Sequence, residues 1–349
     1  MESRPRLGRE ILLTLLLLLL FGIAPLGAGR SSASVSPCPL RDPGPDSGWV
    51  RVPEDFWTVM EAVEAAVHRE LYRVWVGPGS YAFSLPELGA PSLKRILLCG
   101  LGPGFTVLLH QGFPRDLPPD LAPGPWIYLS PKEGEEVVLE GFTLIGGAIR
   151  ISADRFARVL LRNLHILAPG DLSLKGWDGI TITLLREGAQ AILEQVTVQG
   201  ASTGIEILHS GEGEVLLQGA LVSGNEFSGI SISGQGRTII LGSQVIYNGG
   251  SGVTTDGEPW IAIQSSEIAY NKYDGINVGS GTRLLEVNDT RIFANGRYGI
   301  KLFLEPCWER VRNPFQGEVR GRGNEIFDNA KGDLCPADYP WPSGFVRSP

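Results

Sequence analysis

The chain has 349 residues, of which 46 are glycine, and a formal net charge of -8 with an isoelectric point near 5.2. An acidic chain has no overall attraction for nucleic acid or for an anionic membrane surface, so we expect neither as a partner. The glycine content is nearly twice the usual share of roughly 7%, without the Gly-X-Y period of collagen, and it indicates many tight turns.

Residues 1–33 have the pattern of a secretory signal peptide. Three arginines precede an apolar run at 11–24, and small residues follow it. The run is too short to span a bilayer comfortably, so we predict cleavage after Ala33, with Ala28 as the second choice. An uncleaved membrane anchor is the alternative. The mature protein is then secreted or periplasmic, without a membrane span.

Residues 34–52 are rich in proline, glycine and serine, and the first predicted helix follows at 55–71. Its apolar residues recur at helical spacing and indicate one buried face. The residues of this face are Phe56, Val59, Met60, Val63, Val67 and Leu71. Residues 73–85 read as strand, turn and strand, and the proline-rich stretch at 110–126 predicts a long surface excursion.

A repeat occupies the rest of the chain. A glycine followed by an aliphatic residue recurs every 23 to 25 residues, and the pairs begin at Gly179, Gly204, Gly229, Gly252, Gly275 and Gly299. Such a period marks a solenoid, in which each unit buries its apolar face only by stacking on the next. Alternating apolar residues predict three short strands per unit, most clearly in residues 237–259 and 260–282. Leucine-rich and ankyrin patterns are missing, so we predict a parallel β-helix.

An asparagine stands four residues before four of these pairs, at Asn225, Asn248, Asn271 and Asn295. At the same turn of successive coils, each side-chain amide can donate and accept along the stack and also bind turn backbone. We therefore predict a structural asparagine ladder. The glycine after each asparagine is expected to supply a turn conformation that a side chain would resist.

The unit resembles the repeat of the pectate-lyase-like, right-handed parallel β-helix proteins, which include polysaccharide-active proteins and periplasmic NosD-like proteins. The resemblance covers residues 140–332, with an irregular insertion at 305–320. It implies an all-β, single-stranded right-handed parallel β-helix over 53–332, with the helix at 55–71 covering the first coil, because an exposed strand edge would recruit other strands. Residues 333–349 are then a C-terminal tail.

Four cysteines remain after signal cleavage, and they allow three pairings. Cys307 with Cys335 is the preferred disulfide, because both lie where the repeat ends and a loop gains from closure. Zinc is the alternative, but no CxxC or HxxxH spacing supports it, so we predict no metal site.

The catalytic sets of related enzymes are missing from the sequence. It contains neither the Asn-Thr-Asp and Gly-His-Gly of polygalacturonases, nor the Arg-x-Pro-x-x-Arg of pectate lyases, nor the Asp-Pro-His-Glu of alginate epimerases. Whether the protein is an enzyme therefore stays open, and an enzyme would be a polysaccharide lyase or a glycoside hydrolase. No cofactor is predicted, except calcium in the case of a lyase.

Residues near the asparagine turn are the best candidates for a site. Lys272, Asp274 and Arg297 lie on adjacent coils and are the catalytic candidates, with a solvated turn surface as the alternative. Aromatic rings suit sugar contact, with simple cover of the turn as the alternative. The carbohydrate-binding candidates are Tyr247, Trp260, Tyr270, Tyr273 and Tyr298. Residues 283–322 hold eight Lys or Arg against five acids, where an anionic polysaccharide would be tolerated.

Three functions fit these observations. The first is a monomer that binds, or modifies, a polysaccharide or cell-envelope glycan on its lateral surface. The second is a non-catalytic envelope protein that uses the β-helix as a rigid rod. The third is a NosD-like accessory protein for copper, which rests on fold analogy alone, because the four histidines are well separated in the sequence and Met60 is the only methionine after cleavage.

Overall fold

The computed structural model describes residues 36–83, 95–110, 127–168, 178–309 and 311–347. The predicted signal peptide and nearly all of the proline-rich stretch at 110–126 lie outside the described residues. Residues from Cys38 onward form one compact unit. Within the part of the chain that the structure describes, no helix is long and apolar enough to cross a membrane.

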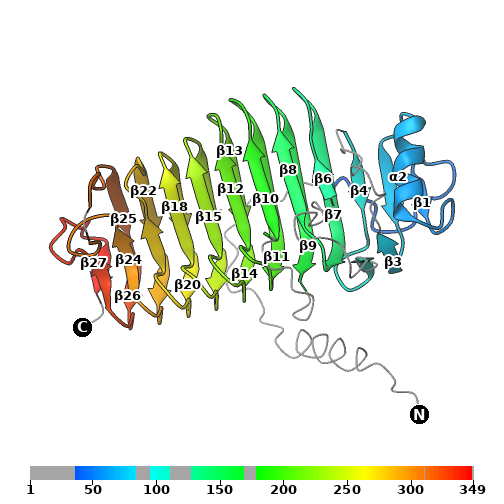
Figure 1. The fold of residues 1–349 in the computed structure, drawn as a ribbon. Coiled ribbons are helices and arrows are strands. Elements are labelled where there is room, and N and C mark those ends of the chain that lie inside the picture. Colours follow the sequence, from blue (N-terminus) through cyan, green and yellow to red (C-terminus); the bar gives the residue numbers. More distant parts are fainter. Residues whose placement is uncertain (1–35, 84–94, 111–126, 169–177, 310, 348–349) are drawn as a thin grey trace, which may run out of the picture. The chain divides into compact units, whose positions relative to one another are not determined.

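Parallel strands of successive coils stack into three faces (Figure 1). Face 1 contains one strand from each of nine coils: β6 (Ile127–Leu129), β8 (Ile149–Ala153), β10 (Ile180–Leu184), β12 (Ile205–His209), β15 (Ile230–Gly234), β18 (Val253–Gly257), β21 (Ile276–Val278), β24 (Tyr298–Leu302) and β27 (Gly332–Cys335). The three short strands per unit predicted at 237–259 and 260–282 are all present in the structure.

The other two faces share three long strands. These are β7 (Glu136–Ile145), β9 (Arg158–Leu167) and β11 (Gln190–Gln199). Face 2 continues them with β1 (Val50–Val52), β2 (Arg73–Val76), β4 (Leu97–Cys99), β13 (Glu214–Gln218), β16 (Arg237–Leu241), β19 (Trp260–Gln264), β22 (Leu284–Asn288) and β25 (Glu318–Arg322). Face 3 adds β3 (Gly79–Phe83), β5 (Thr106–His110), β14 (Leu221–Ser223), β17 (Gln244–Ile246), β20 (Glu267–Ala269), β23 (Arg291–Phe293), β26 (Asn324–Phe327) and β28 (Phe345–Arg347).

Rows of identical or similar aliphatic side chains fill the interior of the coils. The residue after each repeat glycine lies in one register along face 1, from Ile180 through Ile230 to Ile300. All of these side chains are fully buried. Each coil therefore completes the core of its neighbour, as the repeat predicts.

The repeat glycines are required for a reason other than the predicted one. A Cβ atom on Gly229 would lie 2.7 Å from the side-chain nitrogen of Asn248 and 2.8 Å from the carbonyl oxygen of Gly252. None of the glycines before the aliphatic residues has a positive φ. The glycine makes room for the asparagine ladder and the next coil, whereas we had expected it to supply an unusual turn conformation.

The predicted N-terminal helix is α2 (Val59–His68), which is shorter than the predicted span of 55–71. Thr58 caps it by accepting the backbone N–H of Glu61, whose carboxylate in turn accepts the backbone N–H of Thr58. The helix packs against β1, β2 and β3. Its buried residues are Val59, Ala62, Val63 and Ala66. Val67 and Leu71 are 45% and 36% exposed, so the predicted buried face was partly wrong: two alanines, which leave room for close packing, take part in it.

The C-terminal segment 333–349, which we expected to be a tail, contains ordered structure. Most of β27 lies in it and pairs with β24, and β28 pairs with β26. Aromatic residues pack here against the end of the core: Phe303, Phe315, Tyr339, Trp341 and Phe345. They cover apolar surface that the last coil would otherwise expose to water.

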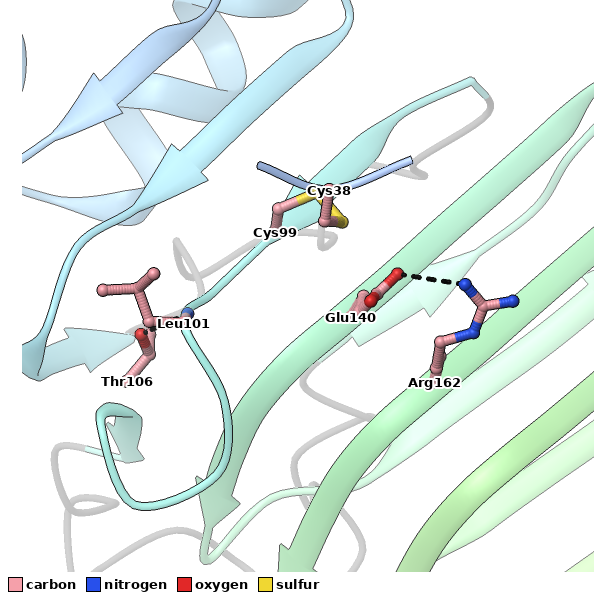
Figure 2. The surroundings of a disulfide bond; sticks show 6 residues. All are labelled: Cys38, Cys99, Leu101, Thr106, Glu140 and Arg162. Carbon is pink, nitrogen blue, oxygen red and sulfur yellow. Dashed lines mark hydrogen bonds and ion pairs between the residues drawn. A yellow bond between two sulfur atoms is a disulfide. The ribbon is translucent and has the colours of Figure 1, made fainter. Parts of the chain in front are cut away.

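Each end of the stack carries a disulfide. Cys307 pairs with Cys335, the pairing that we preferred, and Cys38 pairs with Cys99. Figure 2 shows the Cys38–Cys99 bond and, near it, an ion pair between Glu140 and Arg162. Cys99 and Glu140 are direct neighbours across coils. Cys38 is therefore fastened to the outside of face 2, where Trp75 and the two cysteines form one buried cluster.

Candidate functional site

The asparagine turns form a corner between face 3 and face 1, which we call the Asn-turn edge (residues 225–229, 248–252, 271–275 and 295–299). Each asparagine side chain donates to the Oδ1 atom of the asparagine one coil later, at 2.8 Å, 2.9 Å and 3.0 Å for the three steps. The same Oδ1 atoms accept backbone N–H groups. Asn295 continues the ladder to Asn329 at 2.9 Å. All these side chains are buried, so the ladder holds the edge and leaves contact with ligands to its neighbours.

Aromatic rings line the face 3 side of this edge. Tyr247 and Tyr270 stack with centroids 4.8 Å apart and nearly parallel planes. Phe293 meets Tyr270 edge-on at 5.3 Å and stacks on Phe327 at 5.0 Å. The two tyrosines are 60% and 45% exposed and both have positive φ, which is uncommon for aromatic residues. They follow β17 and β20 directly, and this turn conformation directs the rings outward.

The stack presents mainly ring edges and hydroxyl groups, because neighbouring rings cover each other's faces. Tyr247 is the exception. Its register partner in the preceding coil is Gly224, one residue beyond the pair of Ile246 with Ser223. The space beside Gly224 is open, since a Cβ atom there would meet nothing within 4 Å. One face of the Tyr247 ring is therefore available to an apolar surface of a ligand.

The structure separates the predicted aromatic residues. Tyr273 lies in the turn itself, 40% exposed, with the Arg297 guanidinium 4.2 Å from its ring centroid. Tyr298 is half-buried at the start of β24. Trp260 lies on β19 of face 2, in register with Arg237 and Leu284. Three exposed tyrosines, Tyr247, Tyr270 and Tyr273, thus gather at the Asn-turn edge, and Trp260 is on a different face.

The catalytic candidates do not converge. Asp274 is 2% exposed, and its Oδ1 atom accepts the backbone N–H of Tyr298 at 3.1 Å. Burial raises the pKa of this carboxyl. Lys272 is exposed, while Arg297 lies on Tyr273. In an earlier coil, Asp178 accepts the backbone N–H of Thr203 in the same manner, so both aspartates bind the backbone of the next coil.

A second group of polar side chains runs along the outside of face 1. The residues in register are Arg150, Thr181, Glu206, Ser231, Thr254, Asn277 and Lys301. Burial, and then a hydrogen bond to Asp178, raises the pKa of Glu206 to about 7. The sequence analysis missed Glu206. From Thr181 onward these residues follow the Gly-aliphatic pair directly, so alignment of the repeats could have identified this row and Glu206 in it.

The short separation of Asp178 and Glu206 argues against glycoside hydrolysis by this pair. A hydrogen bond between Glu206 and Asp178 contributes to the raised pKa of Glu206, which places the two carboxyl groups close together. Glycoside hydrolases of the common types need two carboxyl groups about 5–5.5 Å apart for retention, or about 6.5–9.5 Å apart for inversion. A pair in direct contact shares one proton and leaves no room for a sugar bond or a water between the groups. This pair therefore does not form such a catalytic set.

Known proteins share the repeat. Residues 179–335 match the family model described as a right handed beta helix region. The coils in this part of the chain therefore have the repeat of a right-handed β-helix. The predicted fold class, a right-handed parallel β-helix with one short N-terminal helix, is confirmed.

Similar solved structures include the mannuronan C-5 epimerase AlgE6 A-module of Azotobacter vinelandii, with 18% identity over 78% of this chain and 72% of that chain and a TM-score of 0.42. The catalytic domain of a GH87 alpha-1,3-glucanase in complex with tetrasaccharides has 12% identity over 88% of this chain and 69% of that chain, with a TM-score of 0.49. The periplasmic alginate epimerase AlgG has 13% identity over 76% and 74%, with a TM-score of 0.40. The comparison with curated proteins gave no match.

Charged residues on faces 2 and 3 of the β-helix form ion pairs that neutralise one another. Arg162 lies between Glu140 and Glu194, at 3.6 Å and 2.7 Å. The basic residues predicted to tolerate an anionic polysaccharide are also paired in part: Arg283 with Glu258, Arg291 with Glu267 and Glu325, and Arg320 with Glu318. Because each of these ion pairs cancels charge locally, this part of the β-helix offers less positive potential than the residue count suggests.

The histidines of the β-helix are far from forming a metal centre. Among the described residues, no group of three or more His, Cys, Asp or Glu side chains is placed to hold a metal ion. His209 lies inside the coil, 4% exposed, with its Nε2 atom 3.0 Å from the Thr238 hydroxyl.

Proposed function

We propose that this protein binds a neutral polysaccharide along the Asn-turn edge without cleaving it. The observation that carries the proposal is the group of exposed tyrosines on one edge of the β-helix: Tyr247 and Tyr270 lie one coil apart, and Tyr273 lies in the same turn as Tyr270. Aromatic rings supply contact area at a low cost in conformational entropy, and their hydroxyl groups can bind sugar hydroxyls. An extended polymer laid along the edge would meet Tyr247 and Tyr270 about 4.8 Å apart.

Binding is favoured over catalysis by the positions of the acidic groups. Asp274 is engaged with backbone, and Asp178 and Glu206 are in contact with each other. Two disulfides support an exported protein, because such bonds persist in oxidising compartments. A secreted or periplasmic monomer would meet cell-envelope or extracellular glycans.

The proposal is tested with purified residues 34–349 and a panel of neutral and uronic-acid polysaccharides. We expect retarded migration in affinity electrophoresis with at least one neutral polymer and no new reducing ends or unsaturated products. The double variant Tyr247→Ala/Tyr270→Ala should weaken the binding about tenfold or more, since each ring contributes on the order of 1 kcal/mol.

Trp260→Ala is the matched control, because Trp260 is exposed to a similar extent, 49%, but lies on face 2. It should bind as the unaltered protein does. Equal losses in both variants would contradict a site at the Asn-turn edge. Failure to bind any polymer would leave the β-helix as a structural rod, and release of products would make the protein an enzyme.

A further inference from the structure

A notch interrupts the Asn-turn edge at Gly249 and Gly250. The same two positions hold Glu226 and Phe227 in the preceding coil and Lys272 and Tyr273 in the following coil. Backbone hydrogen bonds fix this alignment: Gly250 N–H donates to the carbonyl of Phe227 at 2.7 Å, and Tyr273 N–H donates to the carbonyl of Gly250 at 3.0 Å. At these two turn positions, a coil without side chains therefore lies between two coils with large side chains.

Exposed aromatic rings stand on both sides of the notch. Phe227 is 56% exposed and Tyr273 is 40% exposed. Arg297, from the coil beyond, lies 4.2 Å from the Tyr273 ring centroid and covers the ring face that points away from the notch. The opposite face of Tyr273 is consequently directed toward Gly250. A guanidinium on one face also holds the ring in this orientation.

The backbone of this coil excludes side chains at both positions. A Cβ atom on Gly250 would lie 2.7 Å from the carbonyl carbon of Phe227, and one on Gly249 would collide with the carbonyl oxygen of Glu226. A side chain at either position would force the backbone to move, so this backbone requires glycine at both positions.

The size of the notch suits one ring. Its two walls are two coils apart, about 9.6 Å at the usual inter-strand spacing. A ring held between two aromatic faces needs roughly 7–8 Å between those faces, at about 3.5–4 Å for each contact. A modest inward lean of the exposed Phe227 side chain is enough to close this difference.

We propose that the notch is a sugar subsite that holds one neutral hexopyranose ring with all its hydroxyls equatorial, as in β-linked glucose polymers. The assignment rests on the proposed polysaccharide-binding function and specifies its ligand. A ring of this kind presents only C–H groups on both faces, whereas an axial hydroxyl would meet one of the two aromatic walls. Glu226 and Lys272 are exposed at the rim and offer an acceptor and a donor to the equatorial hydroxyls. Since the two charges are opposite, the rim favours an uncharged ligand.

The test is calorimetric titration of residues 34–349 with the β-1,4-linked hexamer of glucose and with that of mannose, which has an axial hydroxyl at C2. We expect the glucose hexamer to bind at least tenfold more tightly. Phe227→Ala and Tyr273→Ala should each weaken its binding about tenfold, as expected for about 1.4 kcal/mol. Tyr273→Phe should bind as the unaltered protein does, because it keeps the ring.

Phe156→Ala is the matched control, since Phe156 is 54% exposed and lies away from the Asn-turn edge. Unaltered circular dichroism and melting temperature establish that each variant is folded. If glucose polymers bind and only Tyr247→Ala/Tyr270→Ala weakens them, the notch is not the subsite, although the proposed function stands. Equal binding of both hexamers overturns the assigned sugar class. If no polysaccharide binds, both proposals fail.

Discussion

At the scale of single residues, His209 and Glu206 on β12 respond to pH in opposite directions. The His209 side chain is inside the coil, and burial lowers its pKa from 6.5 to about 4. Glu206 is on the outside of the same strand, where burial and Asp178 raise its pKa from 4.5 to about 7. Both shifts oppose the charged form of the side chain.

The His209 shift predicts a loss of stability in mild acid. The unfolded chain binds a proton below about pH 6.5, whereas the folded protein binds it only near pH 4, so the free energy of unfolding falls as the pH decreases between these values. The total loss is about 3 kcal/mol. Urea denaturation from pH 8 to pH 4 measures this effect. With decreasing pH, the free energy of unfolding should fall more steeply for the unaltered protein than for His209→Gln.

Glu206→Gln provides the opposite comparison. The folded Glu206 keeps its proton up to about pH 7 while the unfolded side chain loses it near 4.5, so its contribution to stability is present at low pH and is lost as the pH rises. This variant should gain stability over the unaltered protein at pH 8 and not at pH 4. Parallel profiles for all three proteins would contradict both assignments.

At the scale of elements, the asparagine ladder connects the turns of successive coils. The Nδ2 group of Asn271 donates to the carbonyl of Val245 at 3.0 Å and to Asn295, and its Oδ1 atom accepts from Asn248. Loss of this side chain would leave several buried polar groups without partners, each at a cost of about 1–3 kcal/mol.

Asn271→Ala should therefore lower the free energy of unfolding by about 3–5 kcal/mol. Asn288→Ala is the matched control: Asn288 is half-buried at the end of β22, and its amide donates to Glu286 on the same strand. We expect a change of less than about 0.5 kcal/mol there. Chemical denaturation measures both, and similar small losses would show that the ladder contributes little.

At the scale of the whole molecule, each coil contacts mainly its neighbours, so stability is expected to depend on position along the stack. The two disulfides lie near opposite ends, joining residues 61 and 28 positions apart. The aromatic residues around Trp341 and the helix α2 also lie at the ends. The cross-links and covers are thus concentrated where unpaired strand edges would begin.

Removal of the C-terminal disulfide in Cys307→Ala/Cys335→Ala should loosen that end selectively. Loop closure by this bond is worth about 3–4 kcal/mol. Hydrogen exchange should become faster in β24 to β28 and stay unchanged in β12 to β19, because intervening coils separate them. Cys38→Ala/Cys99→Ala should give the mirror result at the N-terminal end. A uniform loss of protection would mean that the stack unfolds as one unit.

The amino-acid sequence by itself determined the repeat, the three strands per coil and the position of the asparagine turns. These features depend on local patterns: alternation at a period of two places side chains inside or outside, and a spacing of 23 to 25 residues returns the chain to the same corner. The four asparagines could be aligned without knowledge of any distance, since identical residues at one period must lie above one another.

Only the tertiary structure decided which side chains meet across coils of different length. Cys38 reaches Cys99 over 61 positions that include the helix α2 and the strands β1, β2 and β3. Glu206 meets Asp178 through a register that a single inserted residue would have changed. The same register placed Trp260 on another face from Tyr270. The notch at Gly250 is visible only once the neighbouring coils are aligned on both sides, because its walls come from residues 227 and 273. Physical contact in a solenoid is set by the stacking of coils, and the stacking depends on the length of every turn between them.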